Sequence, residues 1–296
     1  MTNELLTALE RERPLSALAE LGAYEALWAD ERTSFASLAR LFRAYPGARP
    51  SDLVTPRTAR EHGAQALALA AAAGVGDFEV CVHGMASYAA RLRDAACPLE
   101  LIYYQGRWPL LDGRCVALVG TRKPSAAGLR CATAAGRLLA LAGFTILSGL
   151  ARGIDTAVHR AVLAAGGATA AVLGTALTAS YPPENAALQR RLAREQLLVS
   201  QVPLIRYARQ GSERNRAFFR ARNATLAALA EALVVVEAGD RSGALIAARH
   251  ACEQRRKVLL LPPCLDDRTL RWPAALLRRG ARALAHLEDL ESALAA

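Results

Sequence analysis

The stretch SGLARGIDTAVH at residues 148–159 places glycine, serine and charged side chains close together. Glycines let a backbone approach a ligand closely, and the amides and dipole at a helix N-terminus favour an anion. Asp155 is expected near the N-cap of a helix, where it would cap the chain and offset the dipole. His159 lies one turn further on, and a lone histidine is usually a hydrogen-bonded structural residue. The stretch therefore predicts a strand end and a helix start that can hold an anion.

An arginine-rich segment, LIRYARQGSERNRAFFRARN at 204–223, is the strongest local signal. It has six arginines against one glutamate, interleaved with a tyrosine and two phenylalanines. Cations that follow a phosphate chain and aromatic rings on which bases stack are typical of single-strand binding. The alternative is a solvated helix face with Phe218 or Phe219 turned into the core. Pro203 and Gly211 indicate that part of the segment is a loop.

The charge of the chain is concentrated around these motifs. Residues 114–224 carry 16 basic and 4 acidic groups, a balance of +12. Residues 1–113 carry 11 and 14, a balance of −3, and residues 225–296 carry 10 and 9, a balance of +1. Such segregation predicts a polyanion-binding surface in the middle third of the chain.

Several classes of protein are not expected. The six cysteines are scattered singly, which argues against a zinc site or a disulfide framework. The first residues, MTNELLTALERERP, have mixed charge and no apolar stretch, so no signal peptide is expected. No apolar run approaches the roughly 18 residues of a membrane span. We therefore expect a cytoplasmic protein with no membrane partner.

The elements that must position these motifs follow from hydrophobic periodicity. Strands are expected over 115–120, 144–149, 168–174, 197–201, 232–238 and 257–263, with helices over 125–142, 153–165, 184–195 and 215–230 and after 238. Short apolar strands alternating with helices predict an α/β fold, a doubly wound, mostly parallel, Rossmann-like sheet. Residues 1–72 have helical spacing and predict a small all-α domain before a second domain at 73–296.

Ligands of such sheets bind beyond the carboxyl ends of the strands. The segments that follow the expected strands, 120–128, 148–155, 174–185 and 237–244, each supply glycine or serine, and several add a cation. The first, GTRKPSAAG, has neither the GxGxxG spacing nor a Walker motif, so no nucleotide cofactor is expected. Its Arg122 and Lys123 precede a helix near Ser125, an arrangement that suits a phosphate backbone.

Catalytic constellations are sparse. The sequence has no paired carboxylates, no GxSxG and no histidine cluster with metal spacing, so we expect neither an enzyme nor a metal site. Ser148, Ser200 and Ser242 have no base nearby in sequence. The alternative is a nucleotide-binding or nucleotide-hydrolysing enzyme that uses the same Rossmann-like pocket, with Asp155 and His159 as acid or base. A third possibility is a regulatory module that senses a small nucleotide.

The chain resembles the DNA-processing protein A (DprA/Smf) family over residues 76–262. The resemblance is carried by VALVGTRKPSAAG, SGLARGIDTAVHRAVLAAGGATAAVLG, YPPENAAL and RARNATLAALAEALVVVEAGDRSGALIAA. It implies an extended Rossmann-like domain, a weakly matching SAM-like domain before it, and a homodimer. It also implies a non-catalytic protein that binds and protects single-stranded DNA and loads RecA recombinase during natural transformation.

The resemblance and the motifs together give a set of expected DNA-binding residues. They are Gly120, Thr121, Arg122, Lys123, Ser148, Gly149, Arg152, Gly153, Arg216, Phe219, Arg220, Arg222 and Asn223. Some positions depart from the family pattern. Gln201 replaces a glutamate, and Ala224 replaces the second arginine of an Arg-Asn-Arg motif, for which Arg216 and Arg220 are expected to compensate.

Overall fold

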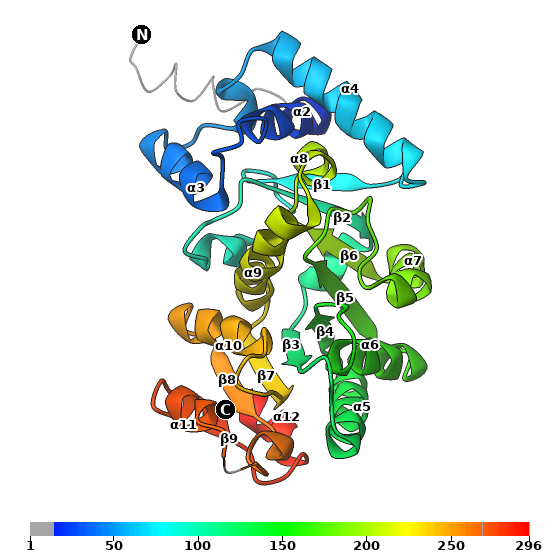
Figure 1. The fold of residues 1–296 in the computed structure, drawn as a ribbon, viewed down its shortest axis with the longest axis vertical. Helices are drawn as coiled ribbons and strands as arrows, with labels where there is room; N and C mark the ends of the chain where they lie inside the picture. The colour runs from blue at the N-terminus through cyan, green and yellow to red at the C-terminus, as the bar shows by residue number, and fades with distance from the viewer. Residues whose placement is uncertain (1–14, 268, 296) are drawn as a thin grey trace.

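The computed structural model describes residues 15–267 and 269–295. Figure 1 shows helices at one end of the molecule, a long twisted sheet through its middle, and the C-terminal helices at the other end. Within this described part, none of the helices combines the length and the apolarity that a membrane span requires.

The N-terminal helices begin at capping residues that the sequence supplies. They are α2 (Ala17–Leu27), α3 (Phe35–Ala44), the 3-10 helix η1 (Pro50–Asp52) and α4 (Pro56–Ala72). Ser16, Ser34 and Thr55 each stand at an N-cap and accept a backbone N–H, which satisfies a donor that the helix itself leaves free. We refer to residues 15–72 as the helical part.

The sheet has nine strands in the described residues. They are β1 (Glu79–Val82), β2 (Leu101–Gly106), β3 (Cys115–Gly120), β4 (Thr145–Ser148), β5 (Ala168–Leu173), β6 (Leu197–Ser200), β7 (Ala232–Glu237), β8 (Lys257–Leu260) and β9 (Arg282–Ala283). Their order is β1-β2-β6-β5-β4-β3-β7-β8-β9. The two pairs that involve β2, with β1 and with β6, are antiparallel, and the other described pairs are parallel. The sheet is therefore mostly parallel, as predicted.

Helices cover both faces of the sheet. They are α5 (Ala126–Leu141), α6 (Ile154–Ala164), α7 (Ala186–Glu195), α8 (Leu204–Arg209), α9 (Ser212–Leu229), α10 (Ala244–Glu253), α11 (Trp272–Leu277) and α12 (Asp289–Ala295). Short 3-10 helices lie between them: η2 (Ala90–Asp94), η3 (Trp108–Leu111), η4 (Pro183–Asn185) and η5 (Pro262–Cys264). Successive residues of β3 enter different cores: Val116 packs with residues of α5 and α6, and Ala117 with residues of α9 and α10. This alternation confirms the doubly wound α/β fold.

A buried carboxylate joins the helical part to the sheet. Glu25 of α2 is fully buried and accepts hydrogen bonds from the Tyr103 hydroxyl (2.8 Å) and from the backbone N–H groups of Leu204 (2.7 Å) and Ile205 (3.1 Å). Burial raises the pKa of Glu25, and these hydrogen bonds oppose the rise. The helical part therefore shares a core with β2 and α8, and the division into domains 1–72 and 73–296 stays a prediction.

The structure differs from the sequence predictions in several elements. The loop expected within residues 204–223 is confined to Gln210 and Gly211, which separate helix α8 from α9. Strands β1, β2 and β9 were not individually predicted. All six cysteines are free thiols, as their single spacing predicts.

Candidate nucleic-acid interface

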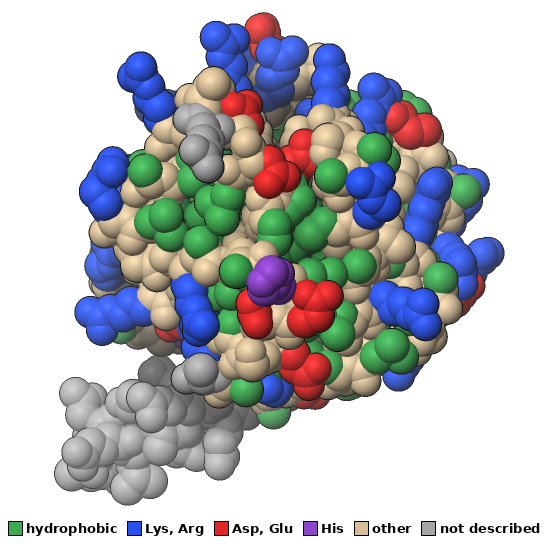
Figure 2. Space-filling view, turned by 90° about the horizontal axis from the view of Figure 1, so that it is seen from below, with side chains coloured by type: hydrophobic (Ala, Val, Ile, Leu, Met, Phe, Trp, Pro, Cys, Tyr) green, Lys and Arg blue, Asp and Glu red, His purple; other side chains and the backbone are tan. Residues whose placement is uncertain are grey.

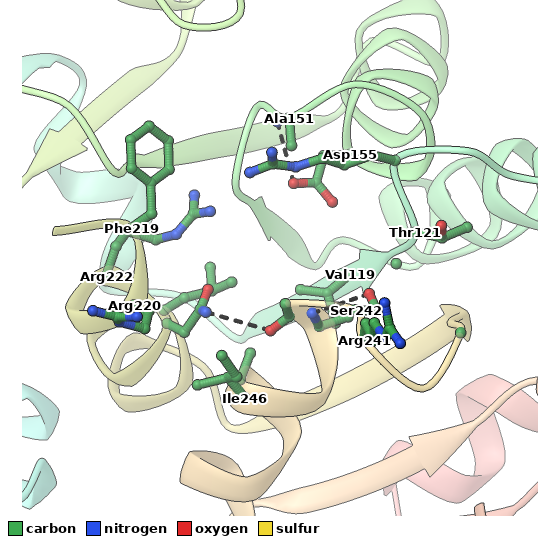
Figure 3. Close-up of a pocket in the computed structure, with 18 of the residues that line it drawn as sticks. Val119, Thr121, Ala151, Asp155, Phe219, Arg220, Arg222, Arg241, Ser242 and Ile246 are labelled. Atoms are coloured by element: carbon green, nitrogen blue, oxygen red, sulfur yellow. Dashed lines mark hydrogen bonds between the residues drawn. The ribbon is translucent and has the colours of Figure 1, made fainter. Parts of the chain in front are cut away.

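A cavity of about 560 Å³ opens at the carboxyl ends of β3 and β7. Its lining residues are Val119, Gly120, Thr121, Arg122, Lys123, Ala151, Asp155, Phe219, Arg220, Arg222, Asn223, Leu226, Gly239, Arg241, Ser242, Gly243, Ala244, Ile246 and Ala247. Figure 3 shows these side chains converging from the β3 loop, the β4 loop, α9 and the start of α10. This place matches the carboxyl edge at which the sequence predicts a ligand.

The rim of this cavity carries cations without partners. Arg122, Lys123, Arg220 and Arg241 are exposed, and none of their side chains forms a hydrogen bond or ion pair with a residue that the structure describes. Asp155 is the one acidic residue among the described lining residues. The cavity therefore has an excess of positive charge directed at solvent, which attracts a polyanion.

The loop that bears Arg122 and Lys123 is held by Glu237. The Glu237 carboxylate accepts the Ser125 N–H at 3.1 Å and the Ser125 hydroxyl at 3.1 Å, and the Glu237 carbonyl accepts the Thr121 N–H at 2.8 Å. Ser125 in turn caps α5. The two cations thus project from a fixed backbone, which lowers the entropy lost when they bind an anion.

Asp155 lies near the N-cap of α6, as expected, but it braces the neighbouring loop and is not itself the cap. Gly153 is the N-cap of α6, with φ of +78°, and a Cβ there would lie 2.5 Å from the Thr121 carbonyl oxygen. Asp155 lies in the first turn, 6% exposed, and its Oδ2 accepts the Ala151 N–H at 3.2 Å. Burial raises the pKa of Asp155, and the positive charge of Arg222 opposes that rise.

Arg222 forms part of the cavity floor and is engaged with the backbone. It is 7% exposed, and its Nη1 donates to the carbonyl oxygens of Gly149, at 2.8 Å, and Val172. A Cβ at Gly149 would lie 2.3 Å from that Nη1, so a larger residue there would force the guanidinium to shift. Arg222 therefore ties α9 to the ends of β4 and β5. Its role as a direct DNA ligand, like that of Asn223 beside it, stays a prediction.

The two phenylalanines of the arginine-rich segment have different environments. Phe218 is 5% exposed and contacts Trp28 and Phe35 edge-on. This ring is therefore turned into the core, which is the alternative that the sequence left open. Phe219 is half-buried and lines the cavity, with Gly174 beneath it and Tyr181 edge-on at 5.3 Å. Only Phe219 is placed where it could stack on a base.

The arginines of the segment also divide into two sets. In the anchor half (Arg206, Arg209, Arg214), Arg206 donates to the carbonyl oxygens of Asp30 and Glu31, Arg209 to Gln65, and Arg214 to the Glu31 carboxylate. In the pocket half (Arg216, Arg220), both side chains are exposed and form no hydrogen bond or ion pair with the described residues. Arg216 lies one turn before Arg220 on α9, outside the lining set.

Five expected residues are not among those that line this cavity: Ser148, Gly149, Arg152, Gly153 and Arg216. Ser148 is fully buried, and its hydroxyl donates to the Leu118 carbonyl at 2.7 Å. Arg152 projects to the other side of its loop and pairs with Glu184. Conversely, Arg241 and Ser242 line the cavity but were not among the expected residues, although the strand-end segment 237–244 that contains them was the signal that could have found them.

The groups proposed for catalysis are not assembled. His159 is fully buried, and its Nδ1 lies 2.8 Å from the Thr169 hydroxyl, which itself donates to the Ile146 carbonyl. Nδ1 therefore carries the proton. Burial, assisted by the charge of Arg222, lowers the pKa of His159 to about 3, so it stays neutral and apart from the cavity. The expectation of a structural histidine is confirmed. Among the described residues, no group of histidine, cysteine and acidic side chains could hold a metal ion.

A family model and the curated relatives both assign the chain to one protein family. A family model described as DNA recombination-mediator protein A matches residues 79–295. The curated Protein Smf of Synechocystis sp. is 38% identical over 216 residues, which cover 71% of this chain and 52% of that protein. The DNA processing protein DprA of Bacillus subtilis is 33% identical over 194 residues, covering 65% of this chain and 63% of that protein. The chain thus spans between half and two thirds of these relatives.

Solved structures share the fold. The X-ray structure of DNA processing protein A from Streptococcus pneumoniae matches with a TM-score of 0.66 and 28% identity, covering 99% of this chain and 98% of that one. A Helicobacter pylori DNA processing protein A, whose structure concerns its single-stranded DNA binding mode, matches with a TM-score of 0.63 and 24% identity over 74% of this chain and 95% of that one. The latter similarity shows a common fold.

Proposed function

The chain belongs to the DNA recombination-mediator protein A family, and we propose that it binds single-stranded DNA in the cavity at the carboxyl ends of β3 and β7. The observation that carries this proposal is the rim of cations, Arg122, Lys123, Arg220 and Arg241, which have no partner in the described part of the chain and surround a half-buried Phe219. Cations for phosphates beside an aromatic ring for a base are what a flexible single strand requires.

The direct experiment is a titration of labelled single- and double-stranded oligonucleotides at two salt concentrations. Single-stranded DNA should bind more tightly, and its affinity should fall as salt rises because bound cations release counterions from the strand. Arg122→Ala should weaken binding about 10-fold for all sequences alike, since a phosphate contact contributes about 1.4 kcal/mol and reads no base.

The matched control is Arg137→Ala. Arg137 is exposed near the end of α5, which returns to the opposite edge of the sheet, and it has no partner among the described residues. Unchanged affinity in the Arg122 variant, or equal losses in both, would contradict the proposed site. Turnover of mono- or dinucleotides that Asp155→Ala abolishes would favour the enzyme instead.

We further propose that the protein protects incoming single strands and loads RecA on them during transformation, in the cytoplasm. The family membership supports this proposal. The test is RecA filament formation on an oligonucleotide coated with single-strand-binding protein. Addition of the chain should accelerate filament formation, and Arg122→Ala should remove most of that acceleration.

We also propose a homodimer formed through the Rossmann-like domain, which residues 73–296 supply. Figure 2 shows hydrophobic side chains grouped on the lower face of the molecule and framed by basic ones. Leu265 and Leu277 belong to segments of that end and are 37% and 40% exposed. Sedimentation equilibrium should give twice the mass of 31.5 kDa, and a monomer at micromolar concentration would contradict this proposal.

A further inference from the structure

A second hollow, of about 330 Å³, lies on the outer side of the loop that follows β4. Its lining residues are Leu129, Arg152, Gly153, Thr156, Ala157, Arg160, Glu184 and Asn185. Ala151 and Asp155 face the first cavity, whereas Arg152 and Gly153 face this one. One short loop therefore separates two openings, each with cations at its edge.

The cations of the second hollow are opposed by a single carboxylate. Arg152 Nη2 donates to Glu184 Oε2 at 3.0 Å, and its Nε contacts the other carboxylate oxygen. This hydrogen bond lowers the pKa of Glu184, so the carboxylate stays ionised. Arg160 is exposed and has no partner among the described residues. Glu184 thus occupies the position that an external anion would need in order to reach Arg152.

Glu184 is held in this position by its neighbour. Asn185 is 3% exposed, and its Nδ2 donates to the Leu150 carbonyl at 3.0 Å and to the Thr156 hydroxyl at 2.8 Å. The Thr156 hydroxyl donates in turn to the Ala151 carbonyl at 2.6 Å. This buried network fixes the backbone beside Glu184. The Glu184 carboxylate is therefore positioned to pair with Arg152.

The segment after β5, which carries Glu184 and Asn185, also reaches the rim of the first cavity. Tyr181, four residues before Asn185, is 48% exposed and contacts the Phe219 ring edge-on at 5.3 Å. Phe219 lines the first cavity. Residues 181–185 therefore run from the aromatic ring of one opening to the ion pair of the other.

We propose that the second hollow is a phosphate site for the same single strand as it leaves the first cavity over Phe219, and that Glu184 competes with the DNA for Arg152. Binding then exchanges one anion for another at the Arg152 guanidinium. An exposed ion pair of this kind is weak, so a phosphate can displace the carboxylate. This inference rests on the proposed function and adds to it a second contact and an internal competitor.

The test is Glu184→Gln, which keeps the shape of the side chain and removes its charge. An oligonucleotide of about 20 nucleotides should bind roughly 3- to 10-fold more tightly. Its plot of log affinity against log salt should steepen by about 0.7, the value for one added phosphate contact on a single strand. The matched control is Glu195→Gln, since Glu195 pairs with Arg191 at nearly the same exposure and should give no change.

A double-mutant cycle separates competition from general electrostatics. In the Arg152→Ala background, Glu184→Gln should have little effect, because the carboxylate no longer has a cation to withhold. A full effect in that background, or no effect of Glu184→Gln in the native chain, overturns the inference. If Arg122→Ala still weakens binding, the proposed function stands without the second site, whereas a native chain that fails to bind single strands overturns both.

Inorganic phosphate distinguishes a strand from a free ligand. If the hollow takes DNA phosphates, inorganic phosphate should compete with the oligonucleotide for the Glu184→Gln variant more strongly than chloride does at equal ionic strength. Inorganic phosphate that binds this variant without changing its affinity for the oligonucleotide would assign the hollow to a free anion and overturn its assignment to the strand.

Discussion

The two halves of the arginine-rich segment have similar composition and opposite environments. The anchor half (Arg206, Arg209, Arg214) is hydrogen-bonded to the helical part, while the pocket half (Arg216, Arg220) is exposed without partners among the described residues. Arg222, two residues beyond, is buried and braces backbone carbonyls. Arginine content alone therefore does not identify a nucleic-acid surface. The pocket half is distinguished by its free charges, because its side chains form no hydrogen bond or ion pair with the described residues.

The largest expected effect is on stability, at Arg222. Arg222→Leu leaves two buried carbonyl groups without donors and the Asp155 charge without its opposing cation, so it should cost about 3 kcal/mol of unfolding free energy. Urea denaturation measures this cost. The control Arg220→Leu should change it by less than about 0.5 kcal/mol, because an exposed unpaired side chain is removed. Equal costs would contradict the assignment of Arg222 to the floor.

The second largest expected effect is on the affinity for single-stranded DNA, which should distinguish rim cations from those of the anchor half. Arg122→Ala combined with Arg220→Ala should weaken single-stranded DNA binding about 100-fold, since two charge-assisted contacts of about 1.4 kcal/mol each are lost. The matched control removes two cations of the anchor half, Arg206→Ala with Arg209→Ala, and should leave affinity within about 3-fold. Fluorescence anisotropy with one oligonucleotide decides between them. A loss in the control as large as in the rim variant would erase the distinction.

The buried histidine predicts a pH dependence of stability rather than of binding. The pKa of His159 is about 3 in the folded chain and about 6.5 when unfolded, so only the unfolded state takes up a proton between these values. Stability is therefore retained above pH 6.5 and lost as the pH falls toward 3.

The comparison of pH 7.5 with pH 5 measures this loss. His159 should account for about 2 kcal/mol of it, and His159→Asn should reduce the difference between the two pH values by that amount. His286→Asn, on the exposed surface, is the control and should not. A pH difference that survives in the His159 variant would contradict the buried, neutral imidazole.

The smallest effect concerns the anchor half alone. Arg206→Ala removes hydrogen bonds to the carbonyl oxygens of Asp30 (3.2 Å) and Glu31 (2.7 Å) and should lower the unfolding free energy by about 1 kcal/mol. Arg209→Ala, which loses one exposed bond to Gln65, should cost about half of that or less. Thermal melts of both variants test this order, and no loss in the Arg206 variant would show that the contact is incidental.

Much of the fold could be predicted because its signals are local. Apolar runs such as CVALVG and ALVVVE end at glycine or acidic loops, and six of the nine strands of the described residues followed from that pattern. β1, β2 and β9 did not: β1 and β9 are short edge strands of four and two residues, and β2 runs antiparallel outside the regular alternation of strand and helix. The start of α6 was predicted to within one residue, because Gly153, whose φ is positive, follows a strand end and caps the helix.

The site was predictable in position but not in the role of each side chain. Strand ends predicted the loops that carry Arg122 and Arg241, because parallel strands bring their carboxyl ends to one edge, and the arginine-rich segment supplied Phe219 of α9. Which way Arg152 projects, and that Arg222 is buried, depend on partners distant in sequence: Glu184 and the carbonyl groups of Gly149 and Val172. No local pattern contains those contacts; the family resemblance implies both arginines as DNA ligands, and that role stays a prediction.

The salt dependence of single-strand affinity tests the central claim most directly, because its slope counts the phosphates that the protein neutralises. Relative to the native chain, the Arg122→Ala, Arg220→Ala variant should flatten the slope by about 1.4, or 0.7 for each lost contact, and the Arg206→Ala, Arg209→Ala variant should leave it unchanged. A slope that is the same in all three proteins, or reduced equally in both variants, would contradict a rim of free cations that meets the phosphates of DNA.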